Sequence, residues 1–157
     1  MSLDVNVIDE AETDPLNRLG FLLARHGASS NDQVRRAFTE CGLGPRQGMT
    51  LMLLGQSGAV AQQALAAKLQ IDASVVVGIL NELESSQLVE RRRDPSDRRR
   101  HIVDITDKGR DVLAKAREAV SDVERSLFGG LSQEEITVLR ELLARIRTSP
   151  SDEACSE

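Results

Sequence analysis

The sequence predicts a mainly α-helical protein with one small β-hairpin, and two observations predict this fold class. Between residues 16 and 147, apolar side chains recur mostly at three- and four-residue intervals, the spacing of one helix face. Residues 88–105 break this pattern, because two β-compatible segments flank Asp94-Pro95-Ser96-Asp97, whose side chains favour a tight turn. We therefore expect helices on both sides of a single hairpin.

The hairpin also concentrates positive charge. Residues 91–100 read Arg-Arg-Arg-Asp-Pro-Ser-Asp-Arg-Arg-Arg and hold six of the chain's 20 Lys and Arg but only two of its 25 Asp and Glu. The segment is therefore +4, in a chain whose net charge is −5. An acidic protein that gathers its cations on one turn is expected to use them on an anionic partner. The alternative is a hairpin whose arginines are simply solvated.

Composition excludes several other classes of protein. The 157 residues are 40% hydrophobic, enough for one domain with helical extensions, and they contain no Trp or Tyr, so stacking of unpaired bases on aromatic side chains is not expected. Residues 1–14 lack the basic start and apolar stretch of a signal peptide. No segment approaches the roughly 20 apolar residues of a membrane span. The sequence predicts a cytoplasmic protein with no membrane partner.

The two cysteines, Cys41 and Cys155, are not expected to form a structural disulfide in a reducing compartment. We interpret Cys41 as a small packed residue, with a redox sensor as the alternative. Residues 148–157, which include Cys155, are rich in Ser, Asp and Glu and predict a disordered tail. We expect residues 1–12 to be mobile as well.

Four helices are predicted before the hairpin, over residues 16–41, 49–54, 61–69 and 73–86. The first contains a run of weak helix formers, from His26 to Asn31, which favours a kink, a close helix crossing or a polar-lined cavity. A tight connection separates the third helix from the fourth, and Asp72 is a good N-cap for the fourth. One face of the fourth helix carries its apolar residues Val76, Ile79, Leu80 and Leu83.

Two more helices are predicted after the hairpin. Thr106 can cap a long helix whose apolar residues are spaced by 3, 4, 3 and 4, as in a coiled coil: Leu113, Ala116, Val120, Val123 and Leu127. Ser132 and Glu135 form a capping box for the last helix. Its apolar residues Ile136, Leu139, Leu143 and Ile146 repeat the 3, 4, 3 spacing.

Two short helices joined by a tight turn and followed by a hairpin are the elements of a winged helix-turn-helix. In that fold the second helix fits the major groove of DNA, which is about 12 Å wide. The hairpin, or wing, can carry arginine into the minor groove, where the negative potential is focused. The order of elements and the basic wing therefore predict binding to double-stranded DNA.

Specific motifs resemble the MarR family of bacterial transcriptional regulators. The family's wing pattern of Asp-x-Arg, three residues, Val, x, Leu, Thr falls on Asp97, Arg99, Val103, Ile105 and Thr106. Leu65-Ala-Ala-Lys-Leu69, Leu88-Val-Glu-Arg91 and Ile105-Thr-Asp-Lys-Gly109 also match, and the resemblance covers residues 16–147.

The resemblance implies a homodimer whose N- and C-terminal helices interlock. We accordingly divide the chain into dimerisation helices at 13–44 and 107–147 and a winged helix-turn-helix DNA-binding domain at 45–106. The alternative is that the apolar faces of the last two predicted helices pack only within one chain. A two-fold pair of wings would read an inverted repeat, with half-sites about one helical turn apart.

For the wing, we expect Arg99 to enter the minor groove, with Arg98 as the second choice. Asp97 is expected to orient Arg99 by a charge-assisted bond to its guanidinium. Arg100, Arg91 and Arg92 are assigned either to phosphates or to bracing the hairpin.

The predicted recognition helix departs from the family, because Gly78 stands where an arginine often stands. Ser74 and Asn81 are the remaining polar candidates for base contacts, and Val75 or Val77 could touch thymine methyl groups. Gln62 and Gln63, at the start of the preceding helix, are either DNA contacts or ordinary surface residues.

MarR-like proteins often bind small aromatic or phenolic anions between the dimerisation helices and the winged domain. The residues of the first helix that could meet such an effector are Arg25, His26, Ser29, Ser30 and Asn31. The alternative is that they crowd a dimer crossing or face solvent.

No enzyme signature is present in the sequence, and His26 and His101 have no partners at metal-ligand spacing, so neither a cofactor nor a metal is expected. We expect a sequence-specific transcriptional regulator, more precisely a ligand-responsive repressor. The alternative is a winged-helix ligand-binding or protein-interaction module with weakened DNA binding.

Overall fold

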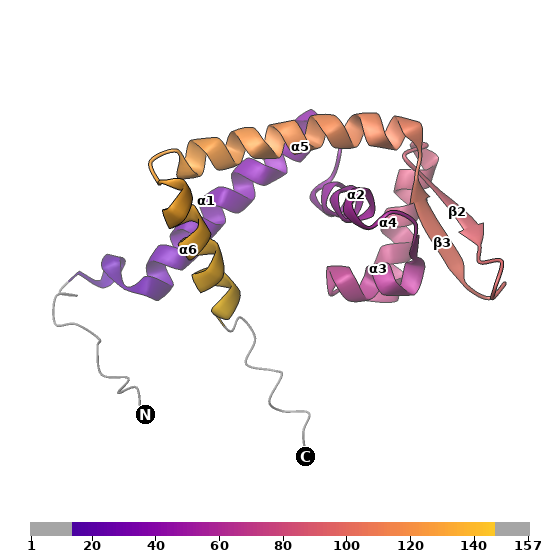
Figure 1. The fold of residues 1–157 in the computed structure, drawn as a ribbon, viewed down its shortest axis with the longest axis horizontal. Helices are drawn as coiled ribbons and strands as arrows, with labels where there is room; N and C mark the ends of the chain where they lie inside the picture. Colours follow the sequence, from indigo (N-terminus) through magenta and orange to yellow (C-terminus); the bar gives the residue numbers. More distant parts are fainter. Residues whose placement is uncertain (1–13, 147–157) are drawn as a thin grey trace, which may run out of the picture. The chain divides into compact units, whose positions relative to one another are not determined.

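The computed structural model describes residues 14–146, so the predicted mobile segment at 1–12 and tail at 148–157 lie outside the described residues. The described chain is mainly helical with a small antiparallel sheet, as predicted (Figure 1). In chain order the elements are η1 (Pro15–Asn17), α1 (Leu19–Glu40), α2 (Pro45–Ser57), β1 (Val60–Ala61), α3 (Gln62–Leu69), α4 (Ala73–Ser85), β2 (Val89–Arg93), β3 (His101–Ile105), α5 (Asp107–Phe128) and α6 (Gln133–Arg145).

The chain forms two compact units that divide after Val123. The first unit contains the winged domain, α1 and most of α5. The second contains the end of α5 and α6. Within residues 14–146 no single helix is long and apolar enough to cross a membrane; α3 and α4 meet that criterion only as a pair, across a bend of 110°.

Helix α1 is continuous through the weak helix formers at 26–31 and begins at Leu19, after a short 3-10 turn that the sequence did not predict. Helix α2 begins four residues earlier than expected. Pro45 suits its first turn because no N–H is needed there, and the Gln47 side chain accepts the Gly44 N–H at 2.8 Å. At Gly48 a Cβ atom would lie 2.5 Å from the Phe38 ring, so a glycine permits the close approach of α1 and α2.

The sheet has three strands rather than two, in the order β1-β3-β2. The predicted hairpin pairs Val89 with Ile105 and Arg93 with His101 at its two ends. Strand β1 adds a third, antiparallel strand through Val60 and Ala61, opposite Val103 and Ile102. Two residues are too few to show an alternating pattern, which is why the sequence did not predict β1.

One apolar core holds the winged domain together. The core face predicted for α4 is confirmed, because all four of its residues are buried. They pack with side chains of α1, α2, α3, the sheet and the first half of α5: Phe38, Leu51, Leu54, Leu65, Val89, Val103, Ile105, Leu113 and Ala116. The opposite side of α4 is left at the surface.

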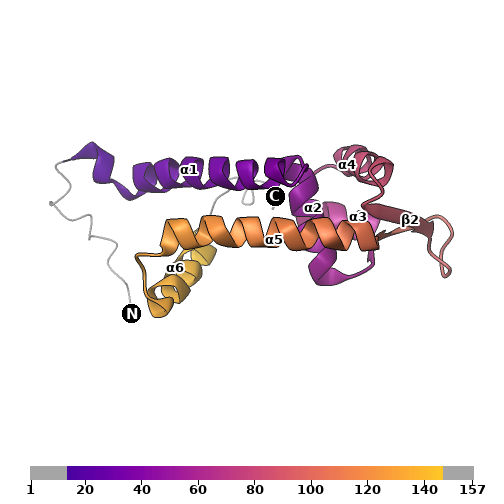
Figure 2. The same cartoon turned by 90° about the horizontal axis from the view of Figure 1, so that it is seen from above.

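The start of α5 is anchored to the segment before β2. Thr106 caps α5 as predicted, since its hydroxyl oxygen accepts the Gly109 N–H at 3.0 Å. The same hydroxyl donates to the Gln87 carbonyl at 2.7 Å, and the Thr106 N–H donates to the Leu88 carbonyl at 3.1 Å. Figure 2 shows α5 leaving the winged domain from this junction.

The capping box of α6 is also confirmed. Ser132 accepts the Glu135 N–H at 3.2 Å, and Glu135 accepts the Ser132 N–H at 2.7 Å. No residue of α6 is buried in the single chain. Its apolar side chains Val138, Leu142 and Leu143 are between 44% and 52% exposed.

Gly109 is required by the junction between the wing and α5. A Cβ atom there would overlap the Leu88 carbonyl oxygen and lie 2.7 Å from Ile105 Cγ1. We expect Gly109→Ala to lower the free energy of unfolding by about 1–3 kcal/mol, as overpacking typically does. Chemical denaturation at a fixed protein concentration measures this.

The matched control is Gly78→Ala, which makes the same change in a helix where a Cβ atom meets nothing within 4 Å. We expect it to raise the free energy of unfolding by up to about 1 kcal/mol, because alanine favours helix over glycine. If Gly109→Ala were as stable as Gly78→Ala, the close approach at Leu88 would not constrain the fold.

Candidate nucleic-acid interface

Helix α4 presents an uncharged face to solvent. The four residues proposed from the sequence to read bases, Ser74, Val77, Gly78 and Asn81, are all exposed. At about 100° per residue they fall within one arc of roughly 100° on the helix, opposite the buried face. The structure therefore brings these candidates together on one surface.

Two carboxylates hold α4 from its two sides. Glu82 accepts a hydrogen bond from the Gln47 amide at the start of α2, at 2.6 Å. Glu84 accepts from Arg91 of β2. These residues are two positions apart, about 200° around the helix, so α2 and the wing flank α4 on opposite sides. The exposed face lies between them.

Arg91 braces the wing, which was one of the two roles predicted for it. Its Nη2 donates to Glu84 Oε2 at 2.6 Å and to Asn81 Oδ1 at 2.6 Å, while its Nε donates to Glu84 Oε2 at 3.1 Å. The side chain is only 21% exposed. The hydrogen bond from Arg91 holds the pKa of Glu84 below its ordinary value, and the positive charge of Arg91 adds to this effect against partial burial, which raises the pKa.

The wing tip is built from two side chain–backbone turns. Asp94 accepts the Ser96 N–H at 2.8 Å and the Ser96 hydroxyl at 2.6 Å. These bonds hold the pKa of the Asp94 carboxyl below its ordinary value. The chain then reverses at Asp97, whose carbonyl accepts the Arg100 N–H at 2.9 Å.

This turn, at Asp97–Arg100, places Arg98 and Arg99 at the two corners of the tip, three residues later than the turn expected at Asp94–Asp97. Both side chains are exposed, and neither forms an ion pair or a side-chain hydrogen bond with the described residues. The arginines predicted to contact DNA most directly are therefore the ones that stand free at the tip.

The predicted bond between Asp97 and the Arg99 guanidinium is wrong. Asp97 Oδ1 accepts the backbone N–H of Arg99 at 3.1 Å, and Asp97 Oδ2 pairs with Arg100 Nε at 3.4 Å. An Asp side chain readily accepts the backbone N–H two residues further along the chain. In a turn, the side chain three residues further along also comes close to the Asp carboxylate. Asp97 thus shapes the backbone that carries Arg99, while its charge partner is Arg100.

The remaining basic residues of the hairpin lie along β2. Arg92 and Arg93 are exposed, and no side-chain bond ties either of them to the part of the chain described. Arg93 lies opposite His101, next to the tip, and was not among the predicted site residues. At the start of α3, Gln62 is half-buried and Gln63 is exposed.

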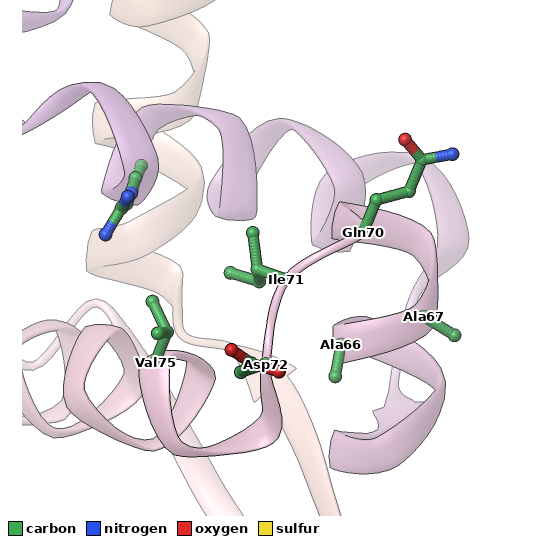
Figure 3. A pocket seen from close by; sticks show the side chains of 7 residues that line it. Ala66, Ala67, Gln70, Ile71, Asp72 and Val75 are labelled. Atoms are coloured by element: carbon green, nitrogen blue, oxygen red, sulfur yellow. The ribbon is translucent and has the colours of Figure 1, made fainter. Parts of the chain in front are cut away.

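Two hollows flank the N-terminal half of α4. The α1–α2–α4 hollow, of about 650 Å³, is lined by Asn31, Arg35, Gly44, Pro45, Arg46, Gln47, Val75, Gly78, Ile79 and Glu82. The α3–α4 hollow, of about 540 Å³, is lined by Arg46, Ala66, Ala67, Gln70, Ile71, Asp72 and Val75. In Figure 3 the Gln70 side chain points away from Ile71 and Val75 in the latter hollow. Arg46 and Val75 line both.

The residues proposed for effector binding lie along α1. Asn31 lines the α1–α2–α4 hollow. Arg25, His26 and Ser29 are exposed and Ser30 is half-buried. Sequence reasoning missed Arg35 and Arg46, because isolated arginines outside a motif carry no signal of their own.

No group of three or more His, Cys, Asp or Glu that could hold a metal ion occurs within residues 14–146. Cys41 is half-buried and packs against the apolar core, in agreement with its interpretation as a packed residue.

A helix-turn-helix with an exposed second helix and an arginine-tipped wing defines the class of winged-helix DNA-binding proteins. The family model of the MarR family matches residues 43–101. A Thauera aromatica protein that is assigned as a transcriptional regulator of the hcr operon is 31% identical over 85% of this chain and 81% of its own length.

Solved structures agree with this match. A MarR-family transcriptional regulator from Rhodococcus sp. RHA1 has a TM-score of 0.71 and 30% identity, over 83% of this chain and 93% of its own. The repressor CouR, solved bound to a 23-mer DNA duplex, has a TM-score of 0.74 and 34% identity, over 80% of this chain and 89% of its own. CouR from Rhodococcus jostii RHA1 was also solved bound to p-coumaroyl-CoA.

This chain belongs to the MarR family. It is a DNA-binding transcriptional regulator with a winged-helix fold.

The brace between Arg91 and Glu84 predicts a pH dependence of stability. Because the pKa of Glu84 is lowered in the folded state, its contribution is complete above the ordinary value of 4.5 and is lost as the pH falls through the lower folded value. We expect Glu84→Gln to lower the free energy of unfolding at pH 7 by about 0.5–1 kcal/mol, the size of a solvent-screened pair. The difference from wild type should shrink as the pH falls below 4.5.

Denaturation curves at several pH values and one protein concentration measure this difference. The control is Glu118→Gln, on an exposed part of α5, where no side-chain bond to a described residue is lost. A difference between Glu84→Gln and wild type that stayed constant from pH 7 to pH 3 would contradict the brace.

Proposed function

We propose that this protein is a homodimeric, ligand-responsive repressor of the cytoplasm that binds an inverted-repeat operator in double-stranded DNA. The observation that carries the proposal is the pairing of a recognition helix whose exposed face is uncharged with a wing whose tip arginines have no partner among residues 14–146. The first suits the interior of the major groove, and the second suits the backbone and the minor groove beside it.

Arg99 is the residue proposed to enter the minor groove. Its backbone N–H is held by Asp97 while its guanidinium is free, so the tip is ordered and the charge remains available. Arg98 occupies the adjacent corner of the same turn. Arg100 is partly neutralised by Asp97, so we assign it a weaker contact to phosphate.

Helix α4 has few groups for reading bases. Arg91 donates to Asn81 Oδ1, so Asn81 retains its amide nitrogen as a donor. A donor at this position would match an acceptor such as N7 or O6 of guanine, N7 of adenine or O4 of thymine. Val77 offers an apolar contact for a thymine methyl group. With so few contacts, sequence-dependent DNA shape would add to specificity.

Exposed apolar side chains support a homodimer. In α1 and the turn before it, Leu16, Leu19 and Phe21 are between 58% and 80% exposed. In α6, a second set of apolar side chains is about half exposed. Large exposed apolar surfaces on a single chain usually mark interaction sites. A two-fold dimer would place two recognition helices about 34–36 Å apart, which is one turn of DNA.

Ligand response is supported by the relatives and by the α1–α2–α4 hollow. CouR was solved both with a DNA duplex and with p-coumaroyl-CoA. In this chain, Asn31 and Arg35 of α1 and Gly78 of α4 line the same hollow. A small aromatic or phenolic anion bound beside α1 could therefore reach the surface that faces DNA.

The second candidate function is a winged-helix ligand-binding or protein-interaction module with weakened DNA binding. Residues 73–80 of α4 contain no charged side chain, which favours this alternative. A DNA titration separates the two functions.

We expect the full-length protein to bind the DNA that precedes its own gene at least about 1,000-fold more tightly than random duplex at physiological salt. Arg99→Ala should weaken operator binding about 10- to 100-fold, the size of one specific arginine contact. Fluorescence anisotropy with labelled duplexes at several salt concentrations gives both values.

The control is Arg140→Ala, which removes an exposed arginine of α6, far along the chain from the wing. Equal, weak affinity of the wild type for operator and random DNA would reject the repressor and favour the second function. Unchanged binding by Arg99→Ala would reject only the minor-groove role.

For the dimer, we expect Leu142→Glu to shift the protein toward monomer, because a charge would replace an apolar side chain that is 49% exposed in the single chain. Thr137→Glu introduces the same residue at another exposed position of α6 and should leave the mass unchanged. Light scattering during size-exclusion chromatography reports the mass. A dimer that tolerated both changes equally would place the interface elsewhere.

A further inference from the structure

We propose that Arg46, at the start of α2, binds the DNA backbone on the side of α4 opposite the wing and supplies a cation that α4 itself lacks. This inference rests on the proposed DNA binding. It assigns a second phosphate contact surface, outside the wing and outside the recognition helix.

The need for such a cation follows from α4. Its first eight residues, 73–80, are Ala-Ser-Val-Val-Val-Gly-Ile-Leu, and none carries a charge. A helix in the major groove has a phosphate backbone on each side of it, with about 12 Å between them. The wing places arginines on one side only, so a positive group on the other side must come from a neighbouring element.

The contacts of α4 identify that element. Glu82 is bonded to Gln47 of α2, and Glu84 is bonded to Arg91 of the wing. These two directions are about 200° apart around α4, and the exposed face lies between them. By the same spacing, Gly78 lies at the edge of that face nearest to Glu82. Helix α2 is therefore the flank that faces away from the wing.

Arg46 lies at this flank. It lines the α1–α2–α4 hollow together with Gly78 and the α3–α4 hollow together with Asp72, and Val75 lines both. Its side chain is exposed and forms no ion pair or hydrogen bond within the described part of the chain. Its neighbour in the first hollow, Arg35, is weakly paired with Asp32 at 3.8 Å.

The charges around Arg46 determine whether this flank of α4 attracts or repels a phosphate. Asp72 lines the α3–α4 hollow and Glu82 lines the α1–α2–α4 hollow, and the Gln47 amide that donates to Glu82 carries no positive charge. Without Arg46, this flank would present negative charge to a negative backbone. The absence of a side chain at Gly78 leaves open space beside it, because a Cβ atom there meets nothing within 4 Å.

The test compares full-length wild type, Arg46→Ala and Arg46→Lys in operator titrations over a range of salt concentrations. Arg46→Ala should lower the slope of log affinity against log salt by about 1 and weaken operator and random DNA by a similar factor, about 10-fold. Arg46→Lys should keep the slope. The matched control is Arg36→Ala, an exposed arginine near the end of α1, which should leave the slope unchanged.

Neither substitution at Arg46 is expected to disturb folding. The hydrogen bond at this position uses the backbone carbonyl of residue 46, which accepts the Thr50 hydroxyl at 2.7 Å and is kept in both variants. Thermal unfolding of each variant checks this. As a second readout, Gly78→Arg in the Arg46→Ala background adds a cation at the same flank and should restore the lost salt slope.

Two results would overturn the proposal in distinguishable ways. If Arg46→Ala kept the wild-type slope and affinity while Arg99→Ala lost binding, the second contact surface would be rejected and the proposed function would stand. If the wild type itself failed to prefer its operator, the proposed function and this inference would both fail.

Discussion

The guanidinium of Arg91 joins the wing to α4, the two parts of this protein that are proposed to face DNA. It reaches from β2 to Asn81 and Glu84 of α4, with contacts of 2.6 Å to each. This contact ties Arg91, the middle residue of β2, to the helix beside the wing. Together with the pairing of β1 with β3 and the burial of Val89, Val103 and Ile105, this contact holds the base of the wing against α4. Charge-assisted bonds of this kind are stronger and more directional than neutral ones.

On the other side, Gln47 serves two elements at once. Its oxygen caps the start of α2 at Gly44, and its amide nitrogen donates to Glu82 of α4. Helix α4 is thus held by polar contacts on both flanks and by the apolar core beneath. Glycine makes the close contacts around this core feasible, at Gly48 against Phe38 and at Gly109 against Leu88. The surface left free is the face between the two polar contacts.

Local sequence was enough to predict the helices, the wing and the caps of α5 and α6, because these depend on neighbours in the sequence. Asp72 stands at the N-cap position of α4 as predicted, but its side chain makes no capping hydrogen bond. Thr106, Ser132 and Glu135 act where the sequence placed them, since a cap is decided within four residues. The bond assigned to Asp97 was wrong because a turn offers a backbone amide as a competing donor. Arg91 was left with two roles, and Arg46 was not singled out, because both depend on partners brought close by folding. Strand β1 was too short to show a pattern.

The segregation of charge has a consequence for how the protein meets DNA. The hairpin segment is +4 in a chain of net charge −5, so the rest of the chain sums to −9 and is expected to repel the polyanion that the hairpin attracts. Such a dipole turns the molecule during approach and suppresses encounters in other orientations. It also keeps loose adsorption on the bulk of the chromosome weak. An acidic regulator can thus spend less time on unrelated sequence than a uniformly basic one, even with the same wing.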